Sequence, residues 1–190
     1  NEDLFGTTER KVNPDYNIYD DIPAPRGKEL KPNTSPMQRF VQTQNFGLVT
    51  KGNCEYEVNK NTLYLTLLRA TGVISNPKNT TRGTPAGPPL ETPKLQCLGE
   101  NTAEFAIAFE SDELNMFKMA ESVYYPCLTL FTEHESQKFF EINNDNIFVY
   151  AIKTDLNGIM LRLFNNSDKK QMLNDNEFQS KEIKNIVIKR

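Results

Sequence analysis

Apolar and polar residues alternate with a period of two along much of this chain. In the stretch 61–70, Leu63, Leu65 and Leu67 share one face, which is the arrangement of a β-strand, whose successive side chains point to opposite faces. Comparable segments recur along the sequence, at 39–42, 47–51, 55–58, 103–110, 139–143, 146–154, 158–165 and 184–189. Many short strands separated by turn residues predict an all-β fold, an antiparallel β-sandwich with little helix.

Two local signals add detail to this pattern. The pair Asn157-Gly158 separates two of the predicted strands, and Asn-Gly is the strongest short-range signal of a tight hairpin. We therefore expect 146–154 and 158–165 to pair antiparallel. Helical signal is confined to 111–125, where Ser111 is a candidate N-cap, and the same stretch is equally compatible with an irregular chain.

The length of 190 residues suits one sizeable domain, and we expect a single β-sandwich domain over 37–190. Residues 1–36 are polar and proline-rich with few alternating runs, which predicts an extended strap or an interdomain connection. We interpret the start at Asn1, without a methionine, as a processed end or as a piece of a longer protein.

The stretch 80–99, "TTRGTPAGPPLETPKLQCLG", interrupts two predicted strands with a long proline- and glycine-rich segment. Proline lowers the entropy lost when a loop is fixed, so such a segment can hold one shape without strand pairing. We predict a preformed surface that docks on a neighbouring domain, and the alternative is a simple crossing between sheets. The residues assigned to docking are Pro85, Gly87, Pro88, Pro89 and Pro93.

Composition excludes several classes of partner. The 22 basic and 25 acidic residues give a net charge of −3, without the broad basic field that binds a phosphate backbone, so we expect no nucleic acid. No window approaches the run of about 18 apolar residues of a membrane span, and the start lacks a signal-peptide core. We therefore expect no membrane partner and a cytoplasmic location. Cys54, Cys97 and Cys127 have no CxxC pairing, and we expect reduced, mostly buried thiols without zinc.

The usual catalytic patterns are absent from the sequence. The single histidine, His134, lies in a polar stretch that predicts a surface turn, and no second histidine or cysteine pair accompanies it. There is no G-x-S-x-G nucleophile elbow, no phosphate-binding loop and no dinucleotide fingerprint. Carboxylates are numerous, but their spacing in space cannot be derived from the sequence. We expect no catalytic residue and no metal ligand in this chain.

Two long segments carry a resemblance to a known family. They are 45–75, "NFGLVTKGNCEYEVNKNTLYLTLLRATGVIS", and 81–109, "TRGTPAGPPLETPKLQCLGENTAEFAIAF". With their "EYEV", "LTLLR" and "AGPP" motifs, they resemble the C-terminal β region of bacterial α-mannosidases of glycoside hydrolase family 38. Weaker likeness extends over "FGTTERKV" and "NTSPMQRFV" upstream and over "YAIKTDLNGIMLRLFNNS" downstream.

The resemblance implies a fold and a parent function. The fold would be the galactose-mutarotase-like supersandwich of the family's C-terminal region, and the chain would be a non-catalytic β domain. The parent would be a retaining, zinc-dependent glycosidase that hydrolyses terminal α-mannosides, with its aspartate nucleophile and its zinc in an N-terminal catalytic domain. That domain would be the partner, mannosyl oligosaccharide would bind through the parent, and the parent could be a homodimer. This part of the enzyme would hold no cofactor and would be inactive alone.

The resemblance also suggests residues at the rim of the substrate pocket. Arg69 matches a family arginine that reaches toward the active site, and Arg82 and Gln96 form a second candidate. The alternative for Arg69 is an ordinary strand-end arginine paired with a carboxylate. A different class of function, a carbohydrate-binding or interaction module, also stays open. Without tryptophan, its sugar stacking would rest on tyrosines, namely Tyr16, Tyr19, Tyr124 and Tyr125.

Overall fold

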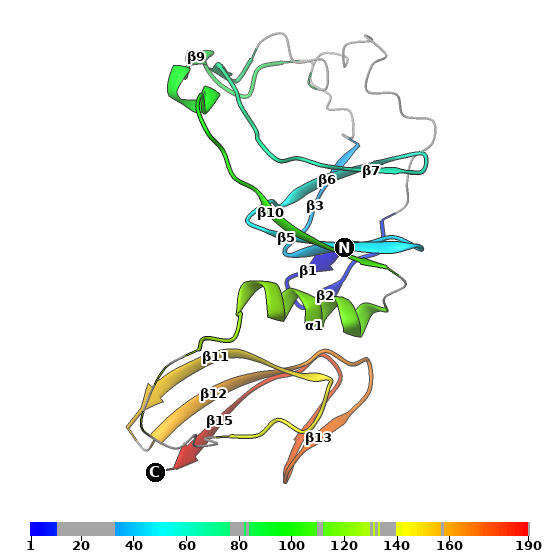
Figure 1. Cartoon of the computed structure of the whole chain (residues 1–190), viewed down its shortest axis with the longest axis vertical. Helices are drawn as coiled ribbons and strands as arrows, with labels where there is room; N and C mark the ends of the chain where they lie inside the picture. The colour runs from blue at the N-terminus through cyan, green and yellow to red at the C-terminus, as the bar shows by residue number, and fades with distance from the viewer. Residues whose placement is uncertain are drawn as a thin grey trace. The chain divides into compact units, whose positions relative to one another are not determined.

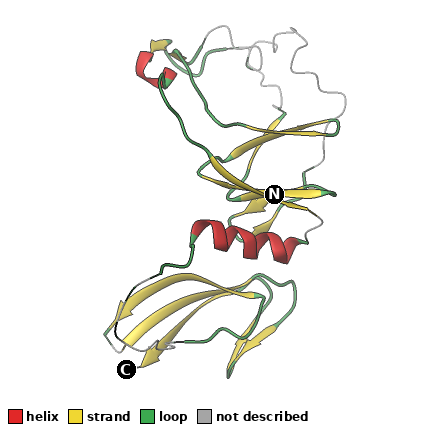
Figure 2. Cartoon of the chain, viewed as in Figure 1, coloured by secondary structure: helices red, strands yellow, loops and turns green. Residues whose placement is uncertain are grey.

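The protein is described from a computed structural model, in which the predicted all-β, antiparallel fold is confirmed (Figure 2). The structure describes residues 1–10, 33–76, 82, 84–109, 112–129, 131, 133, 140–156 and 158–189. They fall into two compact units. Unit 1 comprises Asn1–Glu2 and Thr8–Pro126, and unit 2 comprises Asp3–Thr7 and Cys127–Arg190. The sequence had indicated one domain over 37–190 and placed no boundary near Pro126.

The elements are short strands with one α-helix among the described residues (Figure 1). The N-terminal strands are β1 (Glu2–Asp3) and β2 (Gly6–Thr7). Unit 1 then contains β3 (Thr34–Pro36), β4 (Phe40–Gln42), β5 (Phe46–Lys51), β6 (Glu55–Asn59), β7 (Thr62–Leu65), β8 (Val73–Ile74), β9 (Leu90–Glu91), the 3-10 helix η1 (Pro93–Gln96), β10 (Glu104–Phe109) and α1 (Glu113–Tyr124). Unit 2 contains β11 (Ile147–Asp155), β12 (Gly158–Asn165), β13 (Gln171–Leu173), β14 (Asn176–Phe178) and β15 (Ile183–Lys189).

Two three-stranded antiparallel sheets form the body of unit 1. Their strand orders are β10-β5-β4 and β3-β6-β7. Val41 and Leu48 are paired across β4 and β5, and they belong to one buried cluster with Met37 and Tyr56. Residues of β6 and β7, among them Val58 and Leu65, pack against this cluster. The inward-facing residues of both sheets therefore share one core, as in a sandwich.

Helix α1 covers the other face of the β10-β5-β4 sheet (Figure 1). Phe40 points to that face because side chains alternate along β4, and its ring meets Phe117 of α1 edge-on at 5.0 Å. Met116 of α1 lies over Gly47, where a side chain would collide with it. The stretch that the sequence left open between a helix and an irregular chain is helical, and Asp112, not Ser111, caps it by accepting a hydrogen bond from the Asn115 N–H at 2.7 Å.

A buried ionic cluster around Arg39 links the N-terminus, the turn before β4 and α1. The Arg39 guanidinium bonds the carboxylate of Glu2, with Nη2 2.6 Å from Oε1, and it also bonds Glu121. The Arg39 N–H donates to Glu2 Oε2 at 2.9 Å, and the guanidinium lies 5.8 Å from the Tyr124 ring centroid. Burial opposes the charge of Arg39, but the bonds to Glu2 and Glu121 outweigh it and raise the pKa of Arg39 above its ordinary value.

In unit 2 the predicted hairpin is confirmed. Strands β11 and β12 pair antiparallel, with a register shift between Val149 and Ala151, and β15 pairs with the other side of β12. Gly158 begins β12 at φ +153°, and a Cβ there would stand 2.0 Å from the Ile188 carbonyl oxygen. Only glycine fits this position. The buried core of the unit comprises Ile147, Leu161, Leu163, Leu173 and Phe178.

The turn after β12 is organised by a fully buried amide. Asn165 donates from Nδ2 to the carbonyl oxygens of Lys169 at 2.8 Å and Gln179 at 2.7 Å, and its Oδ1 accepts the Ser167 N–H at 2.9 Å. Because both amide hydrogens are used, this side chain joins the segments before and after the β13-β14 hairpin.

Several sequence expectations were wrong in detail. The strand predicted over 61–70 ends at Leu65, and residues 140–143 of the strand predicted over 139–143 are not in a strand. Cys54 and Cys127 are exposed and Cys97 is half-buried, so the free thiols are not the buried ones expected. The turn predicted around His134 and most of the predicted strap, 11–32, lie outside the described residues.

We predict that Gly47→Ala destabilises unit 1 by about 1–3 kcal/mol, because the new methyl group would enter the space of the buried Met116 side chain, whose Sδ stands 2.1 Å from the Cβ position. Gly87→Ala, whose Cβ would lie 3.4 Å from Ser75 Oγ, is the control and should change the free energy of unfolding by less than about 0.5 kcal/mol. Denaturant unfolding measures both.

A double variant tests the same contact. If Met116 causes the cost, Gly47→Ala combined with Met116→Ala should be less destabilised than the sum of the single variants by about 0.5–3 kcal/mol. Strict additivity would contradict the proposed collision.

Candidate functional site

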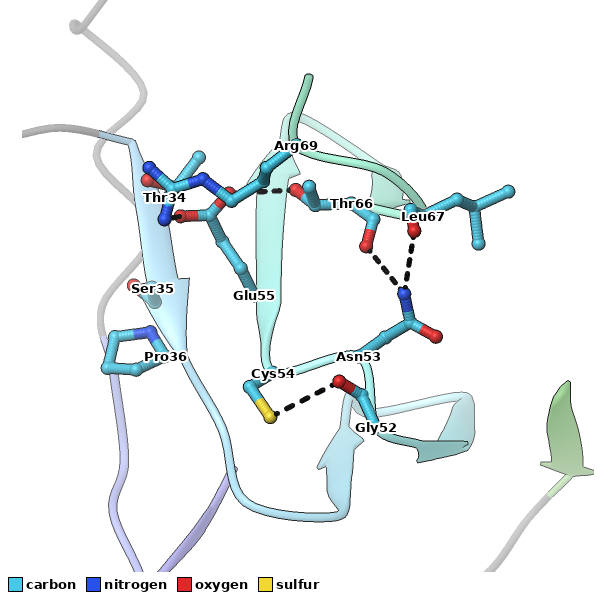
Figure 3. A pocket seen from close by; sticks show the side chains of 10 residues that line it. All are labelled: Thr34, Ser35, Pro36, Gly52, Asn53, Cys54, Glu55, Thr66, Leu67 and Arg69. Atoms are coloured by element: carbon cyan, nitrogen blue, oxygen red, sulfur yellow. Dashed lines mark hydrogen bonds and ion pairs between the residues drawn. The ribbon is translucent and has the colours of Figure 1, made fainter. Parts of the chain in front are cut away.

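The hollow that contains Arg69 is the candidate site of unit 1. It has a volume of about 540 Å³ and lies between β3, the start of β6 and the segment that follows β7 (Figure 3). Its lining residues are Thr34, Ser35, Pro36, Gly52, Asn53, Cys54, Glu55, Thr66, Leu67 and Arg69.

Glu55 and Arg69 face one another at one end of this hollow (Figure 3). Arg69 Nη1 lies 3.7 Å from Glu55 Oε2, and the Thr66 hydroxyl donates to Glu55 Oε1 at 3.0 Å. The alternative reading of Arg69 expected a strand-end arginine paired with a carboxylate. The carboxylate pairing is present, but Arg69 lies four residues beyond the end of β7. The Arg69 side chain is still 79% exposed, so most of its five N–H donors face solvent.

Asn53, which no sequence pattern marked as a site residue, holds the segment that carries Arg69. Its Nδ2 donates to the carbonyl oxygens of Thr66 and Leu67, both at 3.0 Å (Figure 3). The Asn53 carbonyl in turn accepts from the Thr50 hydroxyl at 2.5 Å. The side-chain amide of Asn53 thus replaces strand-to-strand hydrogen bonds at the point where β7 ends. The Gly52-Asn53 pair was visible in the sequence only as a turn signal.

The chemistry of the hollow suits binding. A guanidinium, hydroxyl groups and one carboxylate offer hydrogen-bond donors and acceptors to a small polyhydroxy molecule. Hydrolysis of a glycoside needs two carboxyl groups across the scissile bond, whereas Glu55 is the one carboxylate among the lining residues. The exposed Cys54 thiol contacts the Gly52 carbonyl oxygen at 3.6 Å.

The second pair of predicted rim residues lies elsewhere. Arg82 lines a separate hollow of about 340 Å³ together with Thr71, Val73, Ser75, Asn76, Thr84, Pro85 and Ala86. Gln96 lines neither hollow, and its Nε2 lies 2.7 Å from where a Cβ on Gly72 would stand. The structure therefore does not bring Arg69, Arg82 and Gln96 into one pocket.

We call the described residues of 67–98 the arm. Backbone hydrogen bonds fold it back on itself, from Thr92 N–H to the Gly72 carbonyl at 2.8 Å and from Thr71 N–H to the Leu95 carbonyl at 3.1 Å, and β8 pairs with β9. Pro85, Pro88, Pro89 and Pro93 are exposed on it and Gly87 is half-buried. The arm also exposes six large apolar side chains, namely Leu67, Leu68, Ile74, Leu90, Leu95 and Leu98.

Comparisons with protein-family models, with curated proteins and with solved structures found no match to this chain. Within the described ranges, no three side chains of histidine, cysteine, aspartate or glutamate come together as a metal site would require. In the same part of the chain, none of the helices has the length and apolar character needed to cross a bilayer.

We predict that Asn53→Ala destabilises unit 1 more than Arg69→Ala. Two hydrogen bonds, one part-buried and one exposed, are lost with Asn53, which costs about 1–3 kcal/mol, whereas the exposed ion pair of Arg69 contributes less than about 1 kcal/mol. Urea unfolding of the two variants measures this difference. A larger loss for Arg69→Ala would mean that the ion pair, and not the amide, fixes the segment after β7.

Proposed function

We propose that the chain is the non-catalytic C-terminal β domain of a cytoplasmic, retaining, zinc-dependent α-mannosidase of glycoside hydrolase family 38, an enzyme that hydrolyses terminal α-mannosides. The arm docks on the parent's catalytic domain, and that domain supplies the nucleophile and binds the zinc. The hollow beside Arg69 then contributes to the rim of the substrate pocket, where mannosyl oligosaccharide binds.

The exposed apolar surface of the arm is the observation that supports this proposal most strongly. Six large apolar side chains face solvent on a segment that is cross-linked by backbone bonds and stiffened by proline. Ile74 and Leu90 are direct cross-strand partners, and about half of each side chain is exposed. Apolar side chains gathered on an ordered segment typically mark a surface that a protein partner covers. The proposed assignment to glycoside hydrolase family 38 rests on the resemblance of the sequence motifs alone.

Arg69 supports the rim role in a more limited way. Its guanidinium is held near Glu55 at 3.7 Å but stays mostly exposed, so it can donate paired hydrogen bonds to sugar hydroxyl groups without breaking a buried contact. Arg82 and Gln96 lie on the arm itself and serve the docking surface rather than the same pocket.

A carbohydrate-binding module is the second candidate, and the exposure of Tyr125 favours it. Its side chain is 70% exposed, and its ring lies 6.4 Å from that of Tyr124. The Tyr124 ring, however, is engaged by Arg39, and its hydroxyl accepts the Gly52 N–H at 3.3 Å. Titration of the chain with mannose and mannobiose distinguishes the two candidates, since the docking domain alone should show no saturable binding.

We predict that the chain binds the parent's zinc-containing catalytic region through the arm, and that Leu98→Asp lowers the affinity at least tenfold. Leu98 is 90% exposed in the free chain, so a carboxylate is tolerated there until the partner covers it. Leu156→Asp, at a fully exposed leucine in the β11-β12 turn of unit 2, is the matched control and should leave the affinity unchanged. Calorimetric titration of the purified proteins measures both.

Measurements of activity and of binding can each contradict the proposed function. The chain alone, with zinc added, should not hydrolyse an aryl α-mannoside, and turnover above a zinc-free blank would overturn the non-catalytic assignment. Absence of binding to the catalytic region, or equal losses in both aspartate variants, would overturn the docking role of the arm.

A further inference from the structure

Strand β10 lies at the edge of its sheet and has a symmetric sequence. It pairs with β5 on one side, and no described residue hydrogen-bonds to its other side. The sequence 104–110, "EFAIAFE", reads the same in both directions about Ile107. An unblocked edge strand is a template for pairing with another chain.

The backbone groups that point outward from β10 can be identified from its neighbour. The Thr50 N–H donates to the Arg39 carbonyl and the Phe46 carbonyl accepts the Thr43 N–H, so Phe46, Leu48 and Thr50 direct their backbone groups toward β4. The alternate residues of β5 therefore bond to β10. By register, Glu104, Ala106 and Ala108 take part in those bonds. The N–H and C=O groups of Phe105, Ile107 and Phe109 consequently point to the open edge.

The same three residues carry the exposed apolar side chains of β10. Phe105 is 50%, Ile107 48% and Phe109 77% exposed, and alternation places all three on the sheet face that Leu48 shares. The other face of β10 carries Ala106 and Ala108, which are half-buried. Along β10, exposed apolar side chains thus coincide with backbone groups that have no partner among the described residues.

We propose that β10 is a self-association site, at which a second copy of this chain pairs antiparallel about a two-fold axis through Ile107. Phe105 then lies opposite Phe109 of the second copy, and Ile107 lies opposite its own equivalent. Each of these pairs exchanges two main-chain hydrogen bonds, and the two sheets join into one continuous sheet. The apolar side chains of both copies meet on one face of it. This interface lies outside the arm and does not depend on the proposed function.

The palindrome favours a second copy over an unrelated strand. Any extended peptide can pair with an edge, but a two-fold interface requires the same surface to complement itself, and 105–109 sets an apolar residue opposite an apolar residue at each position. The glutamates that flank the apolar part of the palindromic sequence oppose this pairing, because both copies carry the same negative charges near the joined edge. Lys51, 3.6 Å from Glu104, offsets part of that repulsion. We therefore expect the dimer to strengthen as salt screens the glutamates.

Sedimentation velocity of the 190-residue chain tests the proposal. The mass should rise from 21.8 kDa toward twice that value with concentration, and should rise further at high salt. Ile107→Lys places two like charges on the axis and should leave a folded monomer, checked by circular dichroism. Val187→Lys, at an exposed β-branched residue of the edge strand β15, is the matched control and should still dimerise.

Cysteine cross-linking tests the register. In a background without Cys54, Cys97 and Cys127, Ile107→Cys should form a covalent dimer on mild oxidation, because directly opposite residues of a hydrogen-bonded pair have Cα atoms about 5.5 Å apart, within disulfide range. Phe105→Cys should cross-link only when mixed with Phe109→Cys. A monomeric chain at every concentration and salt, or a dimer that survives Ile107→Lys, overturns the proposal.

Discussion

The ionic cluster of Arg39 is the constraint on which the arrangement of unit 1 depends. Glu2 is almost fully buried, and its carboxylate is matched by the Arg39 guanidinium and by the Arg39 N–H. Removal of one partner from such a buried pair typically costs about 3–5 kcal/mol, because the other charge stays in a medium of low polarity. The Arg39–Glu121 bond extends the same cluster to α1. Three segments far apart in sequence are thereby fixed against one sheet.

The packed core of unit 1 contrasts with the apolar side chains that its arm and β10 expose. The sheets and α1 bury Phe40, Val49 and Phe117, whereas the arm and β10 leave leucine, isoleucine and phenylalanine side chains in solvent. The Asn53 amide and the backbone bonds of the arm hold those exposed segments in one shape. A surface that is ordered before it binds loses little further conformational entropy when a partner covers it. An ordered, exposed apolar surface of this kind supports the proposed docking role of the arm.

The sequence predicted the elements whose signal is local. The Asn-Gly pair in the sequence predicted the hairpin of β11 and β12, and alternation located β5, β10 and β12 to within one residue. The sequence-based prediction failed for elements whose ends are set by contacts between separate segments of the chain. The alternating pattern continues beyond Leu65 because Leu67 is apolar, so the sequence predicted a longer strand. In the structure the Asn53 side chain hydrogen-bonds the carbonyl oxygens of Thr66 and Leu67, and the strand ends before them. Helix α1 gave a weak signal because a narrow stripe around Met116 and Phe117 is buried, against Gly47 and Phe40.

The candidate site was predictable only in part. Arg69 was found, but its distance to Glu55, 14 positions earlier in the sequence, depends on how β6 and β7 pair. Arg82 and Gln96 were a second rim candidate suggested by the family resemblance, whereas Arg82 lines a separate hollow and Gln96 lies beside Gly72. Arg39 and Glu2 are 37 positions apart in the sequence, so no local sequence pattern indicated their contact.

Hydrogen exchange of the full chain, alone and with the catalytic region of the proposed parent enzyme, tests the central proposal that the ordered arm is the surface on which a partner docks. The account predicts slow exchange in β5 and α1 in both samples, and added protection of the arm amides of Thr71, Thr92 and Leu95 once the partner is present. Unit 2 should not change. Unaltered exchange in the arm, with protection appearing elsewhere or nowhere, would contradict the account.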